Sequence, residues 1–247
     1  MIRAFAGAAF ALWTGWAMAC PAPSETVLFH SCWGTARTDL LLMPEDQAAL
    51  NAPGQGLVVT GAYTGKDARD EGLPKPVGLF IAQGRLVNRN MARMDGILLI
   101  GPDGRPELYH RNQVALDAQV YDLTDLNQRG QFLRAAAAAG ISVMQSHLLV
   151  VEGGSDVSPS DDAPVSTRRL FFTDRHGYGI WQSTGALTLH DTAKAAVEAL
   201  APRQALNLDM GSFDYCMTQT GTTRQRCGAV ALDDLTRFSN LLALRLE

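Results

Sequence analysis

Short apolar runs, separated by glycine, proline and polar turns, make up most of the chain. Runs of this length that are bounded by turn residues are typical of β-strands. In the first half they follow one another closely, as in a β-meander. The predicted strands lie near residues 26–30, 39–43, 56–60, 76–81, 86–87, 95–100, 141–144, 148–151, 168–172 and 204–208.

Three other segments have apolar residues at helical spacing. In the last of them, Leu235, Phe238 and Leu242 recur on one face. The segment 153–166, which is rich in Gly, Ser, Asp and Pro, is expected to be an exposed loop. Together these patterns predict an α+β (mixed α/β) fold, in which helices pack on a central mixed β-sheet. The predicted helices lie near residues 124–139, 191–201 and 232–246.

The first nineteen residues have the composition of an export signal. A single charge, Arg3, precedes an apolar stretch, and Ala17 and Ala19 form a small-x-small cleavage pattern. We therefore expect a signal peptide over residues 1–19, followed by one domain over residues 20–247 that is periplasmic or secreted. The apolar stretch is short for a membrane span, and no second long one follows. A less favoured alternative is a lipoprotein acylated at Cys20.

Removing Arg3 with the signal takes the net charge from −4 to −5. A mildly acidic protein lacks the basic surface that nucleic-acid binding requires, so no nucleic-acid partner is expected. The four cysteines form two local couples in an exported chain, which predicts two disulfides. A zinc site is disfavoured, because neither couple is Cys-x-x-Cys. The predicted disulfides are Cys20–Cys32 and Cys216–Cys227.

A cation and a carboxylate end two of the predicted strands. Arg168 opens the run at 168–172, and Asp209 follows the run at 204–208. Both side chains can therefore lie at the mouth of one sheet, where folds often carry functional residues. The alternative is a buried structural ion pair between them.

The common motifs of metal, nucleotide and nucleophile sites are absent from the sequence. There is no zinc-binding helix, phosphate loop, dinucleotide fingerprint or nucleophile elbow. We predict no metal and no cofactor. The histidines show no ligand spacing, and each is interpreted as a surface or capping residue: His30, His110, His147, His176 and His190.

A set of short motifs, in a fixed order over roughly residues 57–215, resembles the phosphodiester glycosidase family. The resemblance implies a mixed α/β fold with a cleft for a glycan phosphate, lined by strand ends. A phosphorylated glycan or sugar phosphodiester is the implied partner. The motifs are Pro76-Val77-Gly78-Leu79, Gln145-Ser146, Arg168 followed by Gly177, and Ala205-Leu206-Asn207-Leu208-Asp209.

The resemblance also implies roles for individual residues. Arg168 matches the family's arginine, whose planar guanidinium suits two phosphodiester oxygens. Asp209 matches the aspartate of the family's Leu-Asp-Gly-Gly signature, which implies a general acid for the departing phosphate or a base for water. The implied substrate-binding residues are Gly61, Tyr63, Gly78, Gln145, Ser146, Gly211 and Ser212.

Three positions depart from the family's pattern. Val59 and Asp95 stand where asparagines are expected, and Met210 replaces the glycine after Asp209. Valine cannot form the hydrogen bonds of an asparagine, and an ionised aspartate only accepts them. Two interpretations stay open: an exported hydrolase acting on a sugar phosphodiester of the cell envelope, and a non-catalytic envelope glycan-binding or scaffold protein of the same fold. A second carboxylate near Asp209 would favour the hydrolase, and the candidates are Asp95, Glu152, Asp174 and Asp214.

Overall fold

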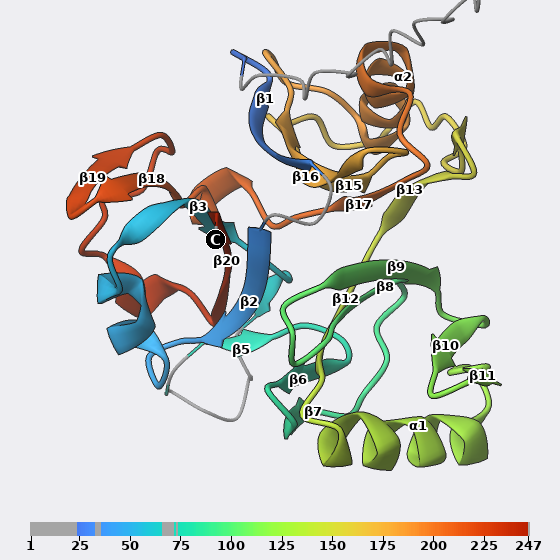
Figure 1. Ribbon diagram of the computed structural model, residues 1–247. Helices are drawn as coiled ribbons and strands as arrows, with labels where there is room; N and C mark the ends of the chain where they lie inside the picture. Colours follow the sequence, from blue (N-terminus) through green and yellow to red (C-terminus); the bar gives the residue numbers. More distant parts are fainter. Residues whose placement is uncertain (1–23, 33–35, 66–71, 73, 247) are drawn as a thin grey trace, which may run out of the picture.

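The computed structural model describes residues 24–32, 36–65, 72 and 74–246, so the predicted signal peptide and Cys20 lie outside the described residues (Figure 1). The described chain forms three large sheets and two short strand pairs. Every strand pairing in them is antiparallel. No helix in this part of the chain is long and apolar enough to span a bilayer.

The six-stranded sheet carries helix α2 (Leu189–Leu200) on its outer face. Thr188 caps this helix by accepting a hydrogen bond from the backbone N–H of Asp191. Ala193 and Ala196 present a small-residue face that packs on the sheet. In spatial order the strands are β1 (Val27–Cys32), β16 (Gly177–Gln182), β15 (Arg169–Thr173), β17 (Gln204–Asn207), β13 (Leu148–Val151) and β14 (Gly154–Ser155).

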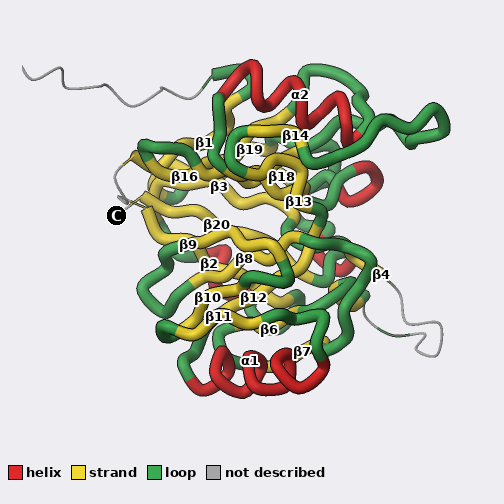
Figure 2. Tube along the Cα trace, turned by 90° about the vertical axis from the view of Figure 1, so that its right-hand side faces the viewer, coloured by secondary structure: helices red, strands yellow, loops and turns green. Residues whose placement is uncertain are grey.

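A five-stranded sheet carries helix α1 (Leu126–Ala138) at the other end of the molecule (Figure 2). Asp125 caps α1 through the backbone N–H groups of Asn127 and Gln128. The hairpin of β10 (Val114–Leu116) and β11 (Gln119–Tyr121) lies beside it. In spatial order the strands are β7 (Arg85–Asn88), β6 (Phe80–Ala82), β12 (Ser142–Ser146), β8 (Gly96–Ile100) and β9 (Pro106–His110).

The second five-stranded sheet combines strands from the N-terminal and C-terminal parts of the described chain. Its strands are β19 (Thr223–Arg226), β18 (Cys216–Gly221), β3 (Gly54–Thr60), β20 (Asn240–Leu246) and β2 (Ala36–Leu42). The remaining elements are the pair β4 (Thr64–Gly65) and β5 (Lys75–Pro76) and three single turns of 3₁₀ helix, η1 (Gln47–Asn51), η2 (Gly211–Phe213) and η3 (Leu235–Arg237).

The three large sheets share one hydrophobic core. Phe171 of β15, Met144 of β12 and Val59 of β3 all belong to the same buried cluster. Alternate residues of β15 face the other way, so Leu170 and Phe172 pack under α2. The sheets therefore bury apolar side chains on both faces, and this fixes the strand ends relative to one another.

The predicted α+β fold with a mixed sheet is wrong, because the molecule is predominantly β with antiparallel sheets and two α-helices among the described residues. The helices predicted at 124–139 and 191–201 are confirmed. The helix predicted at 232–246 is instead η3 followed by strand β20. Leu242 and Leu244 of β20 face the central core, whereas Leu241 and Ala243 face an outer cluster. A strand that is buried on both faces has no polar side, so its sequence is easily mistaken for a helix.

Candidate functional site

The candidate site lies where the chain passes three times from one sheet to another. Gly61 follows β3, His147 links β12 to β13, and Asn207 ends β17. Backbone hydrogen bonds join these crossings, since Asp209 donates its N–H to Gly61 O at 2.9 Å and Asn207 donates to His147 O at 2.9 Å. Ser146 Oγ also donates to Asn207 O at 2.5 Å. The crossings thus form one hydrogen-bonded platform.

Asp209 is the carboxylate of this platform, and only 5% of its surface is exposed. Burial raises the pKa of the Asp209 carboxyl from 3.8 to about 6, although hydrogen bonds from Thr64 and from the Met210 backbone act in the opposite direction. The bond from Thr64 N to Oδ2 measures 2.8 Å. A carboxyl with a pKa near neutrality can donate a proton or accept one.

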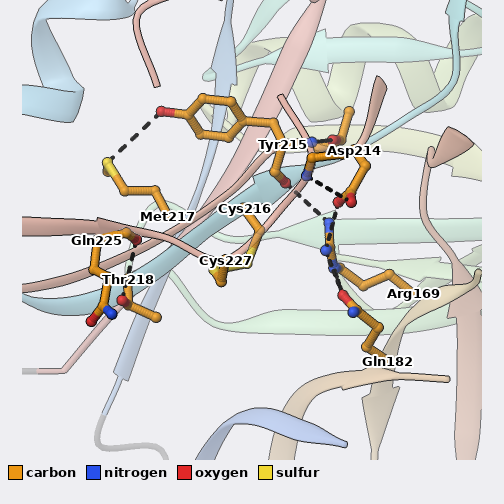
Figure 3. The surroundings of a disulfide bond; sticks show 11 residues. Arg169, Gln182, Asp214, Tyr215, Cys216, Met217, Thr218, Gln225 and Cys227 are labelled. Atoms are coloured by element: carbon orange, nitrogen blue, oxygen red, sulfur yellow. Dashed lines mark hydrogen bonds and ion pairs between the residues drawn. A yellow bond between two sulfur atoms is a disulfide. The ribbon is translucent and has the colours of Figure 1, made fainter. Parts of the chain in front are cut away.

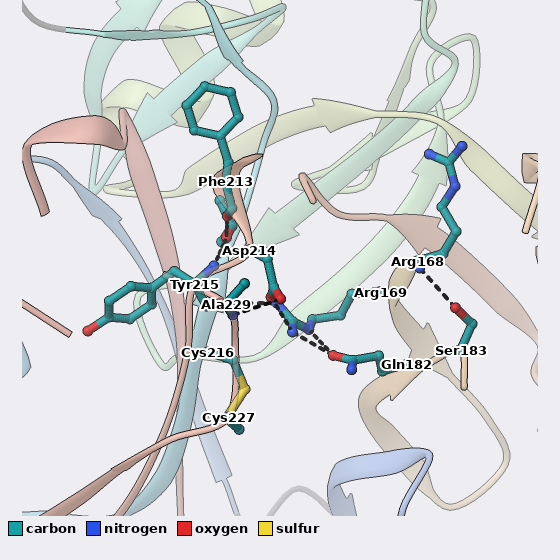
Figure 4. Close-up of polar contacts among 11 residues, drawn as sticks. Arg168, Arg169, Gln182, Ser183, Phe213, Asp214, Tyr215, Cys216, Cys227 and Ala229 are labelled. Carbon is teal, nitrogen blue, oxygen red and sulfur yellow. Dashed lines mark hydrogen bonds and ion pairs between the residues drawn. A yellow bond between two sulfur atoms is a disulfide. The ribbon is translucent and has the colours of Figure 1, made fainter. Parts of the chain in front are cut away.

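Arg168 immediately precedes β15 and is 9% exposed. Its Nη2 donates to Pro164 O at 2.8 Å, and its Nε donates to Leu187 O at 3.2 Å. No carboxylate of the described residues forms an ion pair with it, so the structural Arg168–Asp209 pair considered above is not found. Figure 4 shows the Arg168 guanidinium pointing away from the neighbouring Arg169 group. A nearly buried cation held only by carbonyl oxygens is suited to bind an anion.

Tyr63 is hydrogen-bonded to Asn207, and both Arg168 and Asp209 act on it electrostatically. Asn207 Nδ2 donates to the Tyr63 hydroxyl oxygen at 2.5 Å. Burial raises the pKa of Tyr63 to about 12, with Arg168 opposing the rise and Asp209 adding to it. The phenol therefore stays protonated and lies within the electrostatic reach of both charges. Among the described residues, no group accepts the Tyr63 hydroxyl proton, and the buried Asn207 Oδ1 has no hydrogen-bond partner.

His147 belongs to the site, although the sequence interpretation placed it at the surface or in a cap. Its half-buried ring packs edge-on against Tyr63, with the ring centroids 6.0 Å apart. Burial lowers the pKa of His147; Asp95 opposes this effect and Arg168 adds to it. The position of His147 between two apolar runs was the available signal, because a single polar residue there marks a crossing between buried strands.

Comparison with known proteins points to one fold. Neither a family model nor a curated protein matches the sequence of this chain. The structure is similar to that of zebrafish N-acetylglucosamine-1-phosphodiester alpha-N-acetylglucosaminidase (NAGPA) catalytic domain, auto-inhibited by its pro-peptide. The identity is 14%, the TM-score is 0.50, and the match covers 86% of this chain and 73% of that one. The two share a fold.

A hypothetical protein from Synechocystis is also similar to this chain, with 11% identity and a TM-score of 0.44 over 87% of this chain and 58% of that one. The likeness to the zebrafish catalytic domain supports the expected resemblance at the level of a distant structural relationship. The roles of individual residues remain predictions.

Gln145 and Gly78 hold loops together. Gln145 Oε1 accepts hydrogen bonds from Leu79 N and Ala92 N, at 3.1 and 2.9 Å. Its Nε2 donates to Ala92 O and Met94 O, at 3.2 and 2.6 Å. Gly78 has φ +83°, and a Cβ there would lie 2.6 Å from Gln145 Oε1. All four hydrogen-bonding positions of Gln145 are therefore occupied, so its contribution to ligand binding is indirect.

The other predicted substrate-binding residues fall into two groups. Gly61 and Ser146 are buried in the platform, and a Cβ on Gly61 would collide with Asn240 Oδ1. Gly211 and Ser212 are exposed and begin η2, directly after the acid-bearing segment. Gly211 adopts φ +74°, which a glycine accommodates without strain. Of these residues, only the second group has surface available to a ligand.

Asp214, one of the four candidate second carboxylates, belongs to a structural pair. Its Oδ1 lies 2.8 Å from Nη2 of the fully buried Arg169. Arg169 also donates to Gln182 Oε1 and to Tyr215 O, the latter at 3.0 Å (Figures 3 and 4). Beside this pair lies the Cys216–Cys227 disulfide, which confirms that prediction. The predicted Cys20–Cys32 bond involves a residue outside the described part.

The remaining carboxylate candidates separate by position. Glu152 follows β13 and Asp174 follows β15, so both lie at the end of the six-stranded sheet that is opposite to Asp209. Asp95 Oδ1 accepts a hydrogen bond from Leu148 N at 2.9 Å, and its charge acts on His147. Asp95 is therefore the candidate that reaches the site. Over the described residues, no three His, Cys, Asp or Glu side chains are grouped so as to hold a metal ion.

Proposed function

We propose that this protein is an exported glycosidase-like hydrolase that cleaves a sugar–phosphate diester, with Arg168 binding the phosphate and Asp209 exchanging the proton. The proposal is carried by one combination: a nearly buried guanidinium that pairs with no carboxylate of the described residues, and a buried carboxyl whose pKa is raised to about 6. Both groups act on the same phenol, Tyr63. The fold shared with a phosphodiester α-N-acetylglucosaminidase domain supports this substrate class.

In this proposal one set of residues binds the phosphate and another transfers protons. Arg168 and the Tyr63 hydroxyl donate hydrogen bonds to the phosphate oxygens. The bond between the anomeric carbon and the phosphate oxygen breaks, and a water oxygen bonds to that carbon. Asp209, when protonated, supplies its proton to the departing phosphate. The proton lost by water is taken up by His147, whose lowered pKa favours the neutral, proton-accepting ring.

Asp95 is the proposed second carboxylate. Its carboxylate is fixed by Leu148 N and acts electrostatically on His147. A negative charge beside the imidazole stabilises the imidazolium that forms when His147 takes a proton from water. Asp95 therefore acts through His147 and is a positioning residue in this mechanism.

Export is supported by two features. The predicted signal peptide at residues 1–19 has the composition of a secretory leader. The Cys216–Cys227 disulfide is of a kind that persists in oxidising compartments. We therefore propose that the protein acts in the periplasm or outside the cell, on a phosphate-linked sugar of the envelope.

A specific observation favours the second candidate function, a non-catalytic glycan-binding or scaffold protein. Val59, which replaces an expected asparagine, is fully buried near the end of β3, and its side chain has no polar atom to offer a ligand. Met210, next to Asp209, is also buried. Without the asparagine, one hydrogen-bonding group for the substrate is lost, and the buried Met210 restricts access of water to Asp209. Both changes weaken catalysis more than they weaken phosphate binding by Arg168.

The deciding experiment screens the chain from Cys20 onward, with its disulfides formed, against sugar 1-phosphodiesters that carry a chromogenic leaving group. Turnover that Asp209→Asn and Arg168→Gln abolish, while exposed controls Asp103→Asn and Arg134→Gln retain it, supports the hydrolase. Circular dichroism shows whether each variant is folded. Binding of phosphorylated sugars without turnover in any condition contradicts the hydrolase and supports the binding protein.

A further inference from the structure

An open cavity of about 1010 Å³ lies at the other end of the six-stranded sheet, away from the candidate site. Strands β13, β15 and β17 run through the sheet and place the crossings at one end and three turns at the other. No residue of the candidate site lines the cavity. Its polar and cap residues are Glu152, Asp174, Arg175, His176, Ala201 and Arg203.

Asp174 fixes the turn that carries Arg175. Its Oδ1 accepts hydrogen bonds from His176 N at 2.7 Å and Gly177 N at 2.8 Å. Its Oδ2 accepts a hydrogen bond from His30 Nε2 at 2.8 Å. Both oxygens of Asp174 are therefore occupied by donors, and although burial acts to raise the pKa of Asp174, these hydrogen bonds lower it.

Arg203 is fixed by the neighbouring turns. Its N–H donates to Thr173 O at 2.7 Å, and its carbonyl accepts from Gly153 N at 3.0 Å. These bonds tie the three turns together around the cavity. Arg203 and Arg175 consequently extend from a rigid backbone, so little backbone entropy is lost when a ligand binds.

Two residues with left-handed backbone line the same cavity. Glu152 has φ 49° and Ala201 has φ 45°, and neither is a glycine. Ala201 is the C-cap of α2, and Glu152 is the first residue of the two-residue turn from β13 into β14. A left-handed residue is common at both kinds of position. The two turns form part of the wall of the cavity.

The charged side chains of the cavity retain most of their hydrogen-bonding capacity. Within the described residues, the Arg203 guanidinium and the Glu152 carboxylate have no hydrogen-bond or ion-pair partner, and Arg175 uses only its Nε, which donates to His176 Nε2 at 2.9 Å. Arg175, Arg203 and Glu152, which are all exposed, thus line a common cavity. Guanidinium groups bind carboxylates and phosphates, whereas a carboxylate accepts hydrogen bonds from hydroxyls.

We infer that this cavity is a second binding site, and that it takes an acidic sugar. Arg175 and Arg203 bind the sugar's phosphate or carboxylate, and Glu152 accepts hydrogen bonds from its hydroxyls. The volume is at the upper end of the range for small-molecule sites, which leaves room for more than one sugar unit. The site is separate from Asp209 and does not depend on hydrolysis there.

Calorimetric titration of the chain from Cys20 onward with glucose 6-phosphate, glucuronic acid and glucose tests the inference. The titrations are made in the Arg168→Gln background, so that binding at the candidate site does not contribute. We expect the two acidic sugars to bind and glucose to bind at least about tenfold more weakly, since charged hydrogen bonds contribute about 1.5–3 kcal/mol. Binding of only one acidic sugar supports the inference and identifies the anion.

Substitutions of the cavity residues test whether the acidic sugars bind in this cavity. Adding Arg203→Gln is expected to weaken acidic-sugar binding about tenfold or more, and Arg175→Gln to weaken it too. The matched control is Arg134→Gln, which removes the same charge from the exposed face of α1. Glu152→Gln is expected to weaken binding of the sugars but not of inorganic phosphate. Equal binding of glucose, or equal effects of Arg203→Gln and Arg134→Gln, overturns the inference. Failure of the proposed hydrolysis leaves these results unchanged.

Discussion

Arg168 and Arg169 are adjacent in the sequence, yet their environments are opposite. Arg169 is fully buried and forms an ion pair with Asp214, with further hydrogen bonds to Gln182 and Tyr215. Arg168 is also largely buried, but only carbonyl oxygens contact its guanidinium among the described residues. Consecutive residues near the start of a strand point to opposite sides, which explains how neighbours come to lie in such different places.

The two aspartates differ in the same way. Asp214 has a cationic partner and also accepts a hydrogen bond from Ala229 N at 3.0 Å. Among the described residues, Asp209 accepts hydrogen bonds from Thr64 and from the Met210 backbone and has no cationic partner, and burial raises its pKa. The Arg169–Asp214 region satisfies its charges internally, whereas the Arg168–Asp209 region leaves them available. Unsatisfied charge is typical of sites that bind or react.

The largest expected effect is the difference in activity between variants of Asp209 and Asp214. Asp209→Asn is expected to lower turnover of a sugar phosphodiester by about 10²- to 10⁴-fold, because the proton donor is lost. Asp214→Asn is expected to leave turnover per folded molecule close to that of the wild type. Initial rates, corrected for the folded fraction measured by circular dichroism, test both. Similar losses of turnover for the two variants would contradict the assignment of Asp209 to the reaction and Asp214 to the structure.

For stability we expect the structural pair to matter more than the candidate site residues. Arg169→Ala is expected to lower the free energy of unfolding by about 3–5 kcal/mol, because it leaves Asp214 without its partner. Arg168→Ala breaks two hydrogen bonds to carbonyls and leaves no carboxylate of the described residues unpaired, so we expect a smaller loss of about 1.5–3 kcal/mol. Urea denaturation of both variants provides the measurement. Equal losses would mean that Arg168 is as structural as its neighbour.

The Cys216–Cys227 disulfide lies beside the Arg169–Asp214 pair and is expected to contribute to stability and not to activity. Replacing both Cys216 and Cys227 by serine is expected to lower the free energy of unfolding by about 2–3 kcal/mol, since the bond closes a short loop. Denaturation of the double variant, with reduced wild type as the control, measures this loss. Turnover per folded molecule is expected to stay unchanged. A selective loss of turnover would connect this region to the candidate site.

The smallest expected effect concerns the pH dependence of stability. Folding raises the Asp209 pKa from 3.8 to about 6, so the stability associated with its protonated form is present at acidic pH and is lost as the pH rises through 6. Asparagine carries no charge. Asp209→Asn is therefore expected to be more stable than the wild type by about 1–2 kcal/mol at about pH 8, with little difference at about pH 4. Urea denaturation at the two pH values tests the sign, and a variant less stable at about pH 8 would contradict it.

Local patterns account for what the sequence predicted correctly. Helices α1 and α2 are confirmed because their periodicity and boundaries are encoded within a dozen or so residues. Strand β16 was not predicted, since Gly177 and Gly179 interrupt its apolar run. Both glycines lie against the backbone of β1, where a Cβ would collide with Ser31 O or Phe29 O. That requirement arises from the neighbouring strand and is invisible in the segment itself.

The sequence by itself determined the short-range features: two helices, about half of the strands, the Cys216–Cys227 bond, and the placement of Arg168 and Asp209 at strand ends. The tertiary structure alone decided which arginine is paired, brought His147 beside Tyr63, and assigned Asp214 to the structural side. These contacts join distant segments, with 45 positions between Arg169 and Asp214 and 144 between Tyr63 and Asn207. Their geometry depends on how three sheets pack around one core, and no local pattern of residues records that packing.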